Sequence, residues 1–117
     1  MIVGLGINSA RPAHPNEIDR RRIERALKSR HRYRYVSASI TAVGGGYLVE
    51  SPCCSRNIDI QGGLIEVALL HHDSASACWK VFRKDHRQCV WKLHSTHRRL
   101  AAVTDLLNAD PERVFWQ

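Results

Sequence analysis

Residues 35–51 read YVSASITAVGGGYLVES, and this stretch decides the fold class. Ala38 and Ile40 alternate with serine and threonine residues, which is the period-two pattern of a half-buried strand. The three glycines at 44–46 can supply the positive φ angle that a tight turn needs, and residues 47–51 have the character of a return strand. The stretch therefore predicts a β-hairpin.

Three further strands are predicted downstream of this hairpin. Pro52 ends the second strand, and residues 53–63 are rich in turn formers. The next runs with strand character are residues 64–71, 77–83 and 89–94. A five-residue loop at 84–88 would place Val81 opposite Trp91 and Trp79 opposite Leu93. These four side chains would then share one buried face at the centre of the core.

A helix is predicted on each side of the strands. Asn16 is a capping residue for a helix over about residues 17–30, and Ser95 is one for a helix over about 96–108. Asp110 and Pro111 end the second helix, and the apolar tail 114–116 is expected to fold back onto the body.

The element order is therefore α-β-β-β-β-β-α. Short connections favour an α+β fold in which a five-stranded antiparallel meander sheet is flanked by an N-terminal and a C-terminal helix. We expect residues 1–15 to be a flexible leader and residues 16–117 to form a single domain.

The composition is that of one globular domain. The chain has 117 residues, of which 44% are hydrophobic and 25% charged. Collagen-like repeats, long coiled coils and wholesale disorder are excluded, and no apolar run approaches the roughly 20 residues that span a bilayer. The four cysteines are too few for a disulfide scaffold, and the N-terminus lacks the charges of a signal peptide. We expect a cytoplasmic protein without membrane partners.

The charge is strongly basic and unevenly distributed. The formal net charge is +7, and 14 of the 18 basic side chains are arginine, whose planar fork binds phosphate groups. The basic residues concentrate in 17–34 and 80–99, and Tyr33 and Tyr35 lie where they could stack on unpaired bases. Nucleic acid, or an acidic protein, is the expected partner. The candidate binding residues for nucleic acid or another polyanion are Arg21, Arg25, Lys28, Arg32, Arg34, Lys80, Arg87 and Lys92.

Catalytic signatures are missing from the sequence. The three glycines lack the Lys-Ser/Thr pair of a phosphate-binding loop, and neither G-x-S-x-G nor H-E-x-x-H occurs. We therefore expect a binding domain rather than an enzyme, without a required cofactor.

A zinc or thiol-redox site is the first alternative. Cys53 and Cys54 are adjacent and close to Arg56, which would favour their thiolate forms. With His71 and His72 they make a set of four sulfur and nitrogen ligands of the kind that zinc prefers. No C-x-x-C pair is present, and small buried cysteines in a tight loop explain the same residues.

A homodimeric interaction module is the second alternative. Phe82 and Val90 are expected on the outer face of the sheet, and Phe115 and Trp116 close the chain. Together they could form an apolar patch for self-association through two-fold symmetry. The same terminal aromatic residues could instead cover the face within one chain.

Several segments resemble a known family. They are RYRYV at 32–36, ESPCCSRNID at 50–59, KDH at 84–86, WKLH at 91–94 and DPERVFW at 110–116. The pattern resembles the small uncharacterised bacterial family known only as domain of unknown function 3024, over about residues 18–117. The resemblance implies a bacterial cytoplasmic protein and transfers no functional site, because the family has no assigned activity.

Overall fold

The computed structural model describes residues 13–30, 37–52 and 63–116. Within these ranges the chain follows the predicted order of helix, five strands and helix, which confirms the α+β class. No helix of the described ranges has the length and apolar character needed to cross a membrane. The elements are α2 (Glu17–Ala26), the 3-10 turn η1 (Leu27–Ser29), β1 (Ser39–Val43), β2 (Gly46–Pro52), β3 (Leu64–Asp73), β4 (Cys78–Asp85), β5 (Val90–His97) and α3 (Leu100–Ala109).

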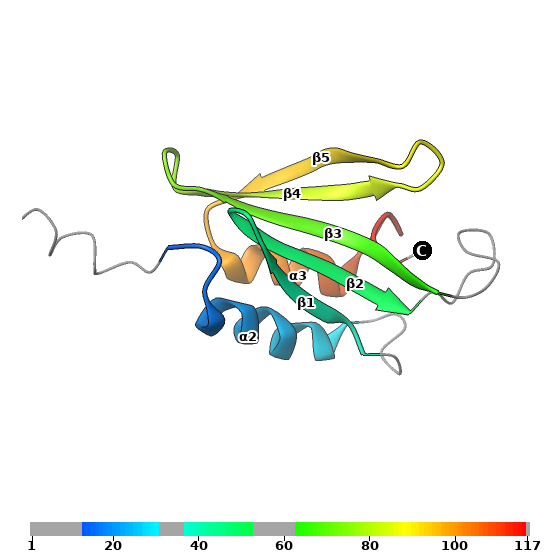
Figure 1. The fold of residues 1–117 in the computed structure, drawn as a ribbon, viewed down its shortest axis with the longest axis horizontal. Coiled ribbons are helices and arrows are strands. Elements are labelled where there is room, and N and C mark those ends of the chain that lie inside the picture. The colour runs from blue at the N-terminus through cyan, green and yellow to red at the C-terminus, as the bar shows by residue number, and fades with distance from the viewer. Residues whose placement is uncertain (1–12, 31–36, 53–62, 117) are drawn as a thin grey trace, which may run out of the picture.

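The five strands form one antiparallel meander in which each strand pairs with the next. Figure 1 shows both helices on the same side of this sheet. The helix α2 contacts β1, and α3 contacts β4 and β5. We call this the helix side of the sheet. No described element covers the opposite side, which carries Leu69 and Phe82 and which we call the open face.

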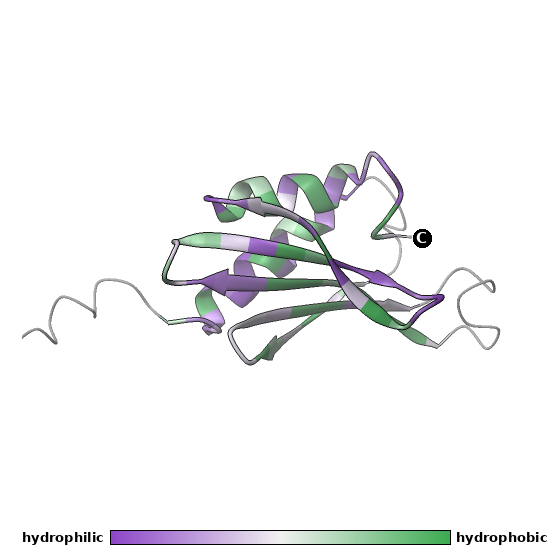
Figure 2. Cartoon of the chain, turned by 90° about the horizontal axis from the view of Figure 1, so that it is seen from above, coloured by the Kyte–Doolittle hydropathy of each residue, from purple (hydrophilic) through white to green (hydrophobic). Residues whose placement is uncertain are grey.

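The core lies between the sheet and the helices. Strand residues alternate between this core and the open face, and Figure 2 shows the resulting alternation of hydrophobic and hydrophilic positions along the strands. The buried apolar residues that form the core are Ile23, Leu27, Ile40, Tyr47, Val49, Ile65, Val67, Ala68, Leu70, Trp79, Val81, Val103, Leu107, Phe115 and Trp116.

The glycine turn between β1 and β2 forms as predicted. Val43 pairs with Gly46, so Gly44 and Gly45 make a two-residue loop. Gly45 has a φ of 77°, in the region that favours glycine. A Cβ atom at Gly46 would overlap the carbonyl oxygen of Leu70 on β3, so this glycine permits the close approach of two backbones.

The β4–β5 register differs from the prediction. The strands are connected by residues 86–89, because Asp85 pairs with Val90 and its carboxylate accepts the backbone N–H groups of Arg87 and Gln88 at 3.0 and 3.1 Å. Trp91 therefore lies opposite Lys84, three residues further along β4 than the predicted partner Val81. An odd shift moves the side chains to the other face.

The expected four-residue core cluster is therefore wrong. Trp79 and Val81 are buried, whereas Trp91 and Leu93 lie on the open face. The same shift separates Val90 from Phe82. Val90 precedes Trp91 on β5, so its side chain points to the helix side, whereas Phe82 stays on the open face. The pairing of β4 with β5, and not the residue pattern of either strand, determines which of these side chains face the core.

The predicted start of the last helix is also wrong. A register shift between Val81 and Phe82 extends the pairing of β5 as far as His97, so Ser95 is a strand residue and α3 begins at Leu100 after Arg99. The end of the chain follows the prediction. Phe115 and Trp116 are 1% and 3% exposed and complete the core beneath the sheet.

Candidate functional site

The acidic side chains of α2 neutralise the first arginines of that helix. Asn16 caps the helix by accepting the backbone N–H of Asp19 at 2.8 Å, which places acidic residues in its first turn. Arg21, a predicted binding residue, is one of the paired arginines. The ion pairs are Glu17–Arg20, Glu17–Arg21 (3.6 Å), Asp19–Arg22 (3.5 Å) and Glu24–Arg20 (3.4 Å).

Arg25 and Lys28 lie further along the same helical segment. Both side chains are exposed, and neither forms an ion pair with the described part of the chain. Their spacing of three residues places them on one side of the helix. Arg32 and Arg34, which were predicted to continue this basic run, lie outside the described residues.

Lys80 and Lys92 are separated from these helix residues. Lys80 lies on the open face, where its ammonium nitrogen is 3.6 Å from Asp73. Lys92 lies on the helix side at the edge strand β5, 2.9 Å from Asp85. This ion pair is the main cause that lowers the pKa of Asp85 to about 2, and the turn N–H groups add to the effect.

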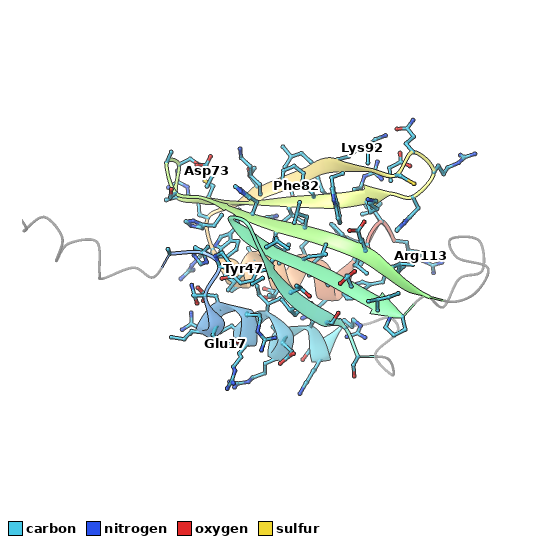
Figure 3. The ribbon with its side chains drawn as sticks, in the orientation of Figure 1. Glu17, Tyr47, Asp73, Phe82, Lys92 and Arg113 are labelled. Carbon is cyan, nitrogen blue, oxygen red and sulfur yellow. The ribbon has the colours of Figure 1, made fainter. Side chains whose placement is uncertain are left out.

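The six predicted polyanion-binding residues that the structure describes therefore do not form one patch. α2 contacts β1 at one edge of the sheet, and Lys92 lies on β5 at the opposite edge. Figure 3 shows Lys92 and Glu17 of α2 on different sides of the molecule. Arg87 lies in the turn between β4 and β5.

The cations that lack an ion pair differ from the predicted set of binding residues. Six described arginine and lysine residues form ion pairs, and a seventh, Arg30, is buried with its guanidinium 4.6 Å from the Trp116 ring centroid. The basic residues without an ion pair to the described part of the chain are Arg25, Lys28, Arg83, Arg87, Arg98, Arg99 and Arg113.

Five of these unpaired cations lie away from the open face. Arg25 and Lys28 belong to the helix layer, and Arg98 and Arg99 lead into α3. Arg83 points to the helix side because it alternates with Phe82 along β4. The N-terminus of α3 has no side-chain cap and adds its dipole to the positive charge of Arg98 and Arg99. Anionic groups would therefore be attracted to the helix side.

Of the four predicted zinc ligands, the structure describes only the two histidines, and it places them on opposite faces of β3. Cys53 and Cys54 lie outside the described residues, between Pro52 and Leu64, which pair at one end of β3. His71 and His72 lie at the other end of β3, roughly 25 Å from Leu64 along the strand, and point to opposite faces. Among the described residues, no group of three or more histidine, cysteine, aspartate and glutamate side chains is arranged to hold a metal ion.

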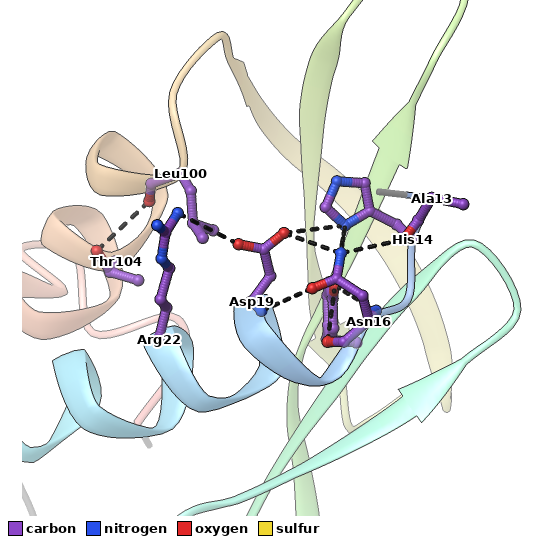
Figure 4. Close-up of polar contacts among 8 residues, drawn as sticks. Ala13, His14, Asn16, Asp19, Arg22, Leu100 and Thr104 are labelled. Atoms are coloured by element: carbon purple, nitrogen blue, oxygen red, sulfur yellow. Dashed lines mark hydrogen bonds and ion pairs between the residues drawn. The ribbon is translucent and has the colours of Figure 1, made fainter. Parts of the chain in front are cut away.

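The sequence pattern missed a partly buried polar cluster at the start of the domain. The Nδ1 atom of His14 is 2.9 Å from the hydroxyl of Tyr47, which also accepts the backbone N–H of Asn16 at 3.0 Å. The same Nδ1 atom is 3.6 Å from Asp19, as the contacts in Figure 4 show. His14, expected in a flexible leader, is therefore packed against the folded body.

Aromatic rings surround this histidine. Its ring centroid lies 4.4 Å from that of His72 and 4.8 Å from that of Trp79. Burial lowers the pKa of His14, and the nearby His72 acts in the same direction, whereas Asp19 opposes it. Burial also raises the pKa of Tyr47, whose side chain is fully buried. The cluster thus attaches residues 13–16 to the sheet.

The residues of the predicted self-association patch are also dispersed. Phe115 and Trp116 are buried beneath the sheet and are not part of the surface. Phe82 remains on the open face, as Figure 3 shows, and Val90 lies on the helix side. Trp91 and Leu93, which the predicted register had placed in the core, lie beside Phe82 on the open face and add to its apolar character.

Comparisons with known proteins identify the family of the chain but assign it no function. No curated protein matches the chain. No solved structure matches it either. The family model described as domain of unknown function DUF3024 matches residues 11–117, which include the packed His14. The match confirms the family resemblance of the sequence segments: the chain belongs to the DUF3024 family.

Proposed function

We propose that the protein is a binding domain for nucleic acid or another polymer of phosphate groups. The observation that carries the proposal is the set of unpaired cations on the helix side and at the β4–β5 turn. Six of these seven cations are arginines, which bind phosphate oxygens in pairs. Binding through contacts to phosphate groups is largely independent of the nucleotide sequence of the ligand.

The positions of the acidic residues of α2 also support the helix side as the binding surface. Among the described carboxylates, Glu17, Asp19 and Glu24 of α2 are each in ion pairs with arginine. They therefore neutralise Arg20, Arg21 and Arg22, which leaves Arg25 and Lys28 for an external partner. The helix α2 has ten residues and is roughly 15 Å long. It can therefore run alongside several consecutive phosphates of a nucleic-acid strand.

Fluorescence anisotropy with a labelled single-stranded oligonucleotide tests the proposal. The wild-type chain should bind at low salt, and its affinity should fall steeply as the salt concentration rises. Arg25→Gln/Lys28→Gln should weaken binding by about tenfold and reduce the slope of log affinity against log salt by about 1.4, since each lost phosphate contact contributes about 0.7.

A control variant separates a local contact from a general loss of charge. Ser74→Glu/Ala75→Glu lowers the net charge by the same amount in the exposed β3–β4 turn. Its salt slope should remain that of the wild type. Equal effects of the two variants, or no binding of the oligonucleotide at low salt, would overturn the proposal. Binding of inorganic polyphosphate with higher affinity than the oligonucleotide would assign the site to a simpler polyanion.

A further inference from the structure

An apolar row crosses the open face of the sheet. On β1 to β4 its members alternate with buried core residues, so their side chains point away from the helices, and the member on β5 pairs with Phe82 on the same face. Leu93, on the edge strand β5, is 54% exposed. The row consists of Thr41, Leu48, Leu69, Phe82 and Leu93, which lie directly opposite one another from β1 to β5.

The charges beside this row are divided between its two halves. Glu50 and Glu66 lie on β2 and β3, and Lys80 and Lys84 lie on β4. With Asp73, acids outnumber lysines and arginines among the described residues of this face, although the whole chain carries +7. A polyanion is therefore disfavoured here, whereas a second copy of the same face can set its lysines on β4 against the acids on β2 and β3.

We propose that the open face binds a second copy of this chain and forms a symmetric dimer of two packed sheets. The two-fold axis would lie in the interface, parallel to the strands and between β3 and β4. This operation places β3 of one copy over β4 of the other. On β2 to β5 each side chain of the row then meets another member of the same row, and β1 lies outside the overlap.

This arrangement matches both apolar and charged groups. Leu69 faces Phe82 of the second copy, and Leu48 faces its Leu93. Glu66 faces its Lys84, so the existing Lys84–Glu66 pair, at 2.8 Å, becomes part of a ring of four alternating charges. Electrostatic complementarity of this kind fixes the orientation of two partners.

The area of the face is sufficient for a specific interface. The four overlapping strands β2 to β5, about 4.8 Å apart, and eight residues of about 3.3 Å rise define a plane of about 500 Å². A standard interface removes about 800 Å² of accessible surface from each partner. The accessible surface of the face is larger than this flat plane, because side chains project from it.

Sedimentation equilibrium of the full chain provides the first test. The average mass should rise from 13.3 kDa towards twice that value as the concentration increases to about 0.1 mM. Leu93→Glu should weaken dimerisation by at least about tenfold because it buries a charge in the interface. Ile18→Glu is the matched control: Ile18 is 64% exposed on α2, so the same chemical change on the helix side should leave the dimer intact.

A charge exchange tests the predicted axis. Glu50→Lys/Glu66→Lys makes both halves of the face basic, and Lys80→Glu/Lys84→Glu makes both acidic. Each variant alone should be monomeric, and an equimolar mixture should form a dimer. A wild-type monomer at all concentrations, or equal weakening by Leu93→Glu and Ile18→Glu, would overturn the proposal. A mixture that stays monomeric beside a wild-type dimer would overturn the axis.

Discussion

The carboxylate of Asp110 accepts the backbone N–H of Trp116 at 2.9 Å, although the two residues lie on opposite sides of a tight turn. The same carboxylate accepts the N–H groups of Val114 and Phe115, and its side chain is buried. Trp116 in turn donates its indole N–H to the carbonyl oxygen of Leu107 at 2.7 Å. A single carboxylate therefore holds the C-terminal aromatic residues in the core.

Asp110→Ala should lower the free energy of unfolding by about 3 kcal/mol, because it leaves buried N–H groups without an acceptor. Asp110→Asn should lose less, since an amide oxygen still accepts. Asp105→Ala, at an exposed aspartate of α3, should change stability by less than about 0.5 kcal/mol. Urea unfolding measures all three, and equal stabilities of the Asp110 and Asp105 variants would contradict this role.

Gly46→Ala should destabilise the protein by about 2–3 kcal/mol, because the new Cβ overlaps backbone atoms of β3 that cannot move independently. Gly44→Ala is its control in the same turn, since no atom lies within 4 Å of a Cβ at Gly44. Thermal unfolding should separate the two variants clearly. A tolerated Gly46→Ala would mean that β2 and β3 pair less closely than described.

The stability of the fold should decrease as the pH falls from about 7.5 to 5.5. Burial lowers the pKa of His14 and of His86 below the ordinary value of 6.5, and Lys84 lowers that of His86 further. The unfolded chain therefore binds more protons as the pH falls through 6.5, which favours unfolding. The measured quantity is the difference in unfolding free energy between the two pH values. His14→Gln/His86→Gln should reduce this difference, and an unchanged difference would assign it to other groups.

Lys92→Met should raise the pKa of Asp85 from about 2 towards 3.8, because the ammonium group is the largest cause of the lowered value. NMR titration of the Asp85 carboxyl carbon measures this directly. Lys80→Met removes a lysine that pairs with Asp73 instead, so it should leave the Asp85 titration unchanged. Equal effects of the two variants would indicate a general charge effect rather than the contact.

Most of the local structure could be predicted from the sequence, because its causes are local. Asn16 starts the first helix through its own side chain, and the glycines at 44–46 determine the first turn. The alternation of apolar and polar residues identifies the strands. Asp110 ends the last helix with a left-handed backbone at φ 36°. Composition and charge also gave the basic character on which the proposed function rests.

Two outcomes depended on tertiary structure. The β4–β5 register changed because the Asp85 side chain caps a shorter turn, and an odd shift then moved Trp91 beside Lys84, whose ammonium lies 4.9 Å from the ring centroid. Which cations are free was also undetermined, because an arginine run does not reveal which members meet a carboxylate from the same helix or a neighbouring strand. Residue type and periodicity set what each segment becomes, whereas register and ion pairing arise only when distant segments come within a few ångströms of one another.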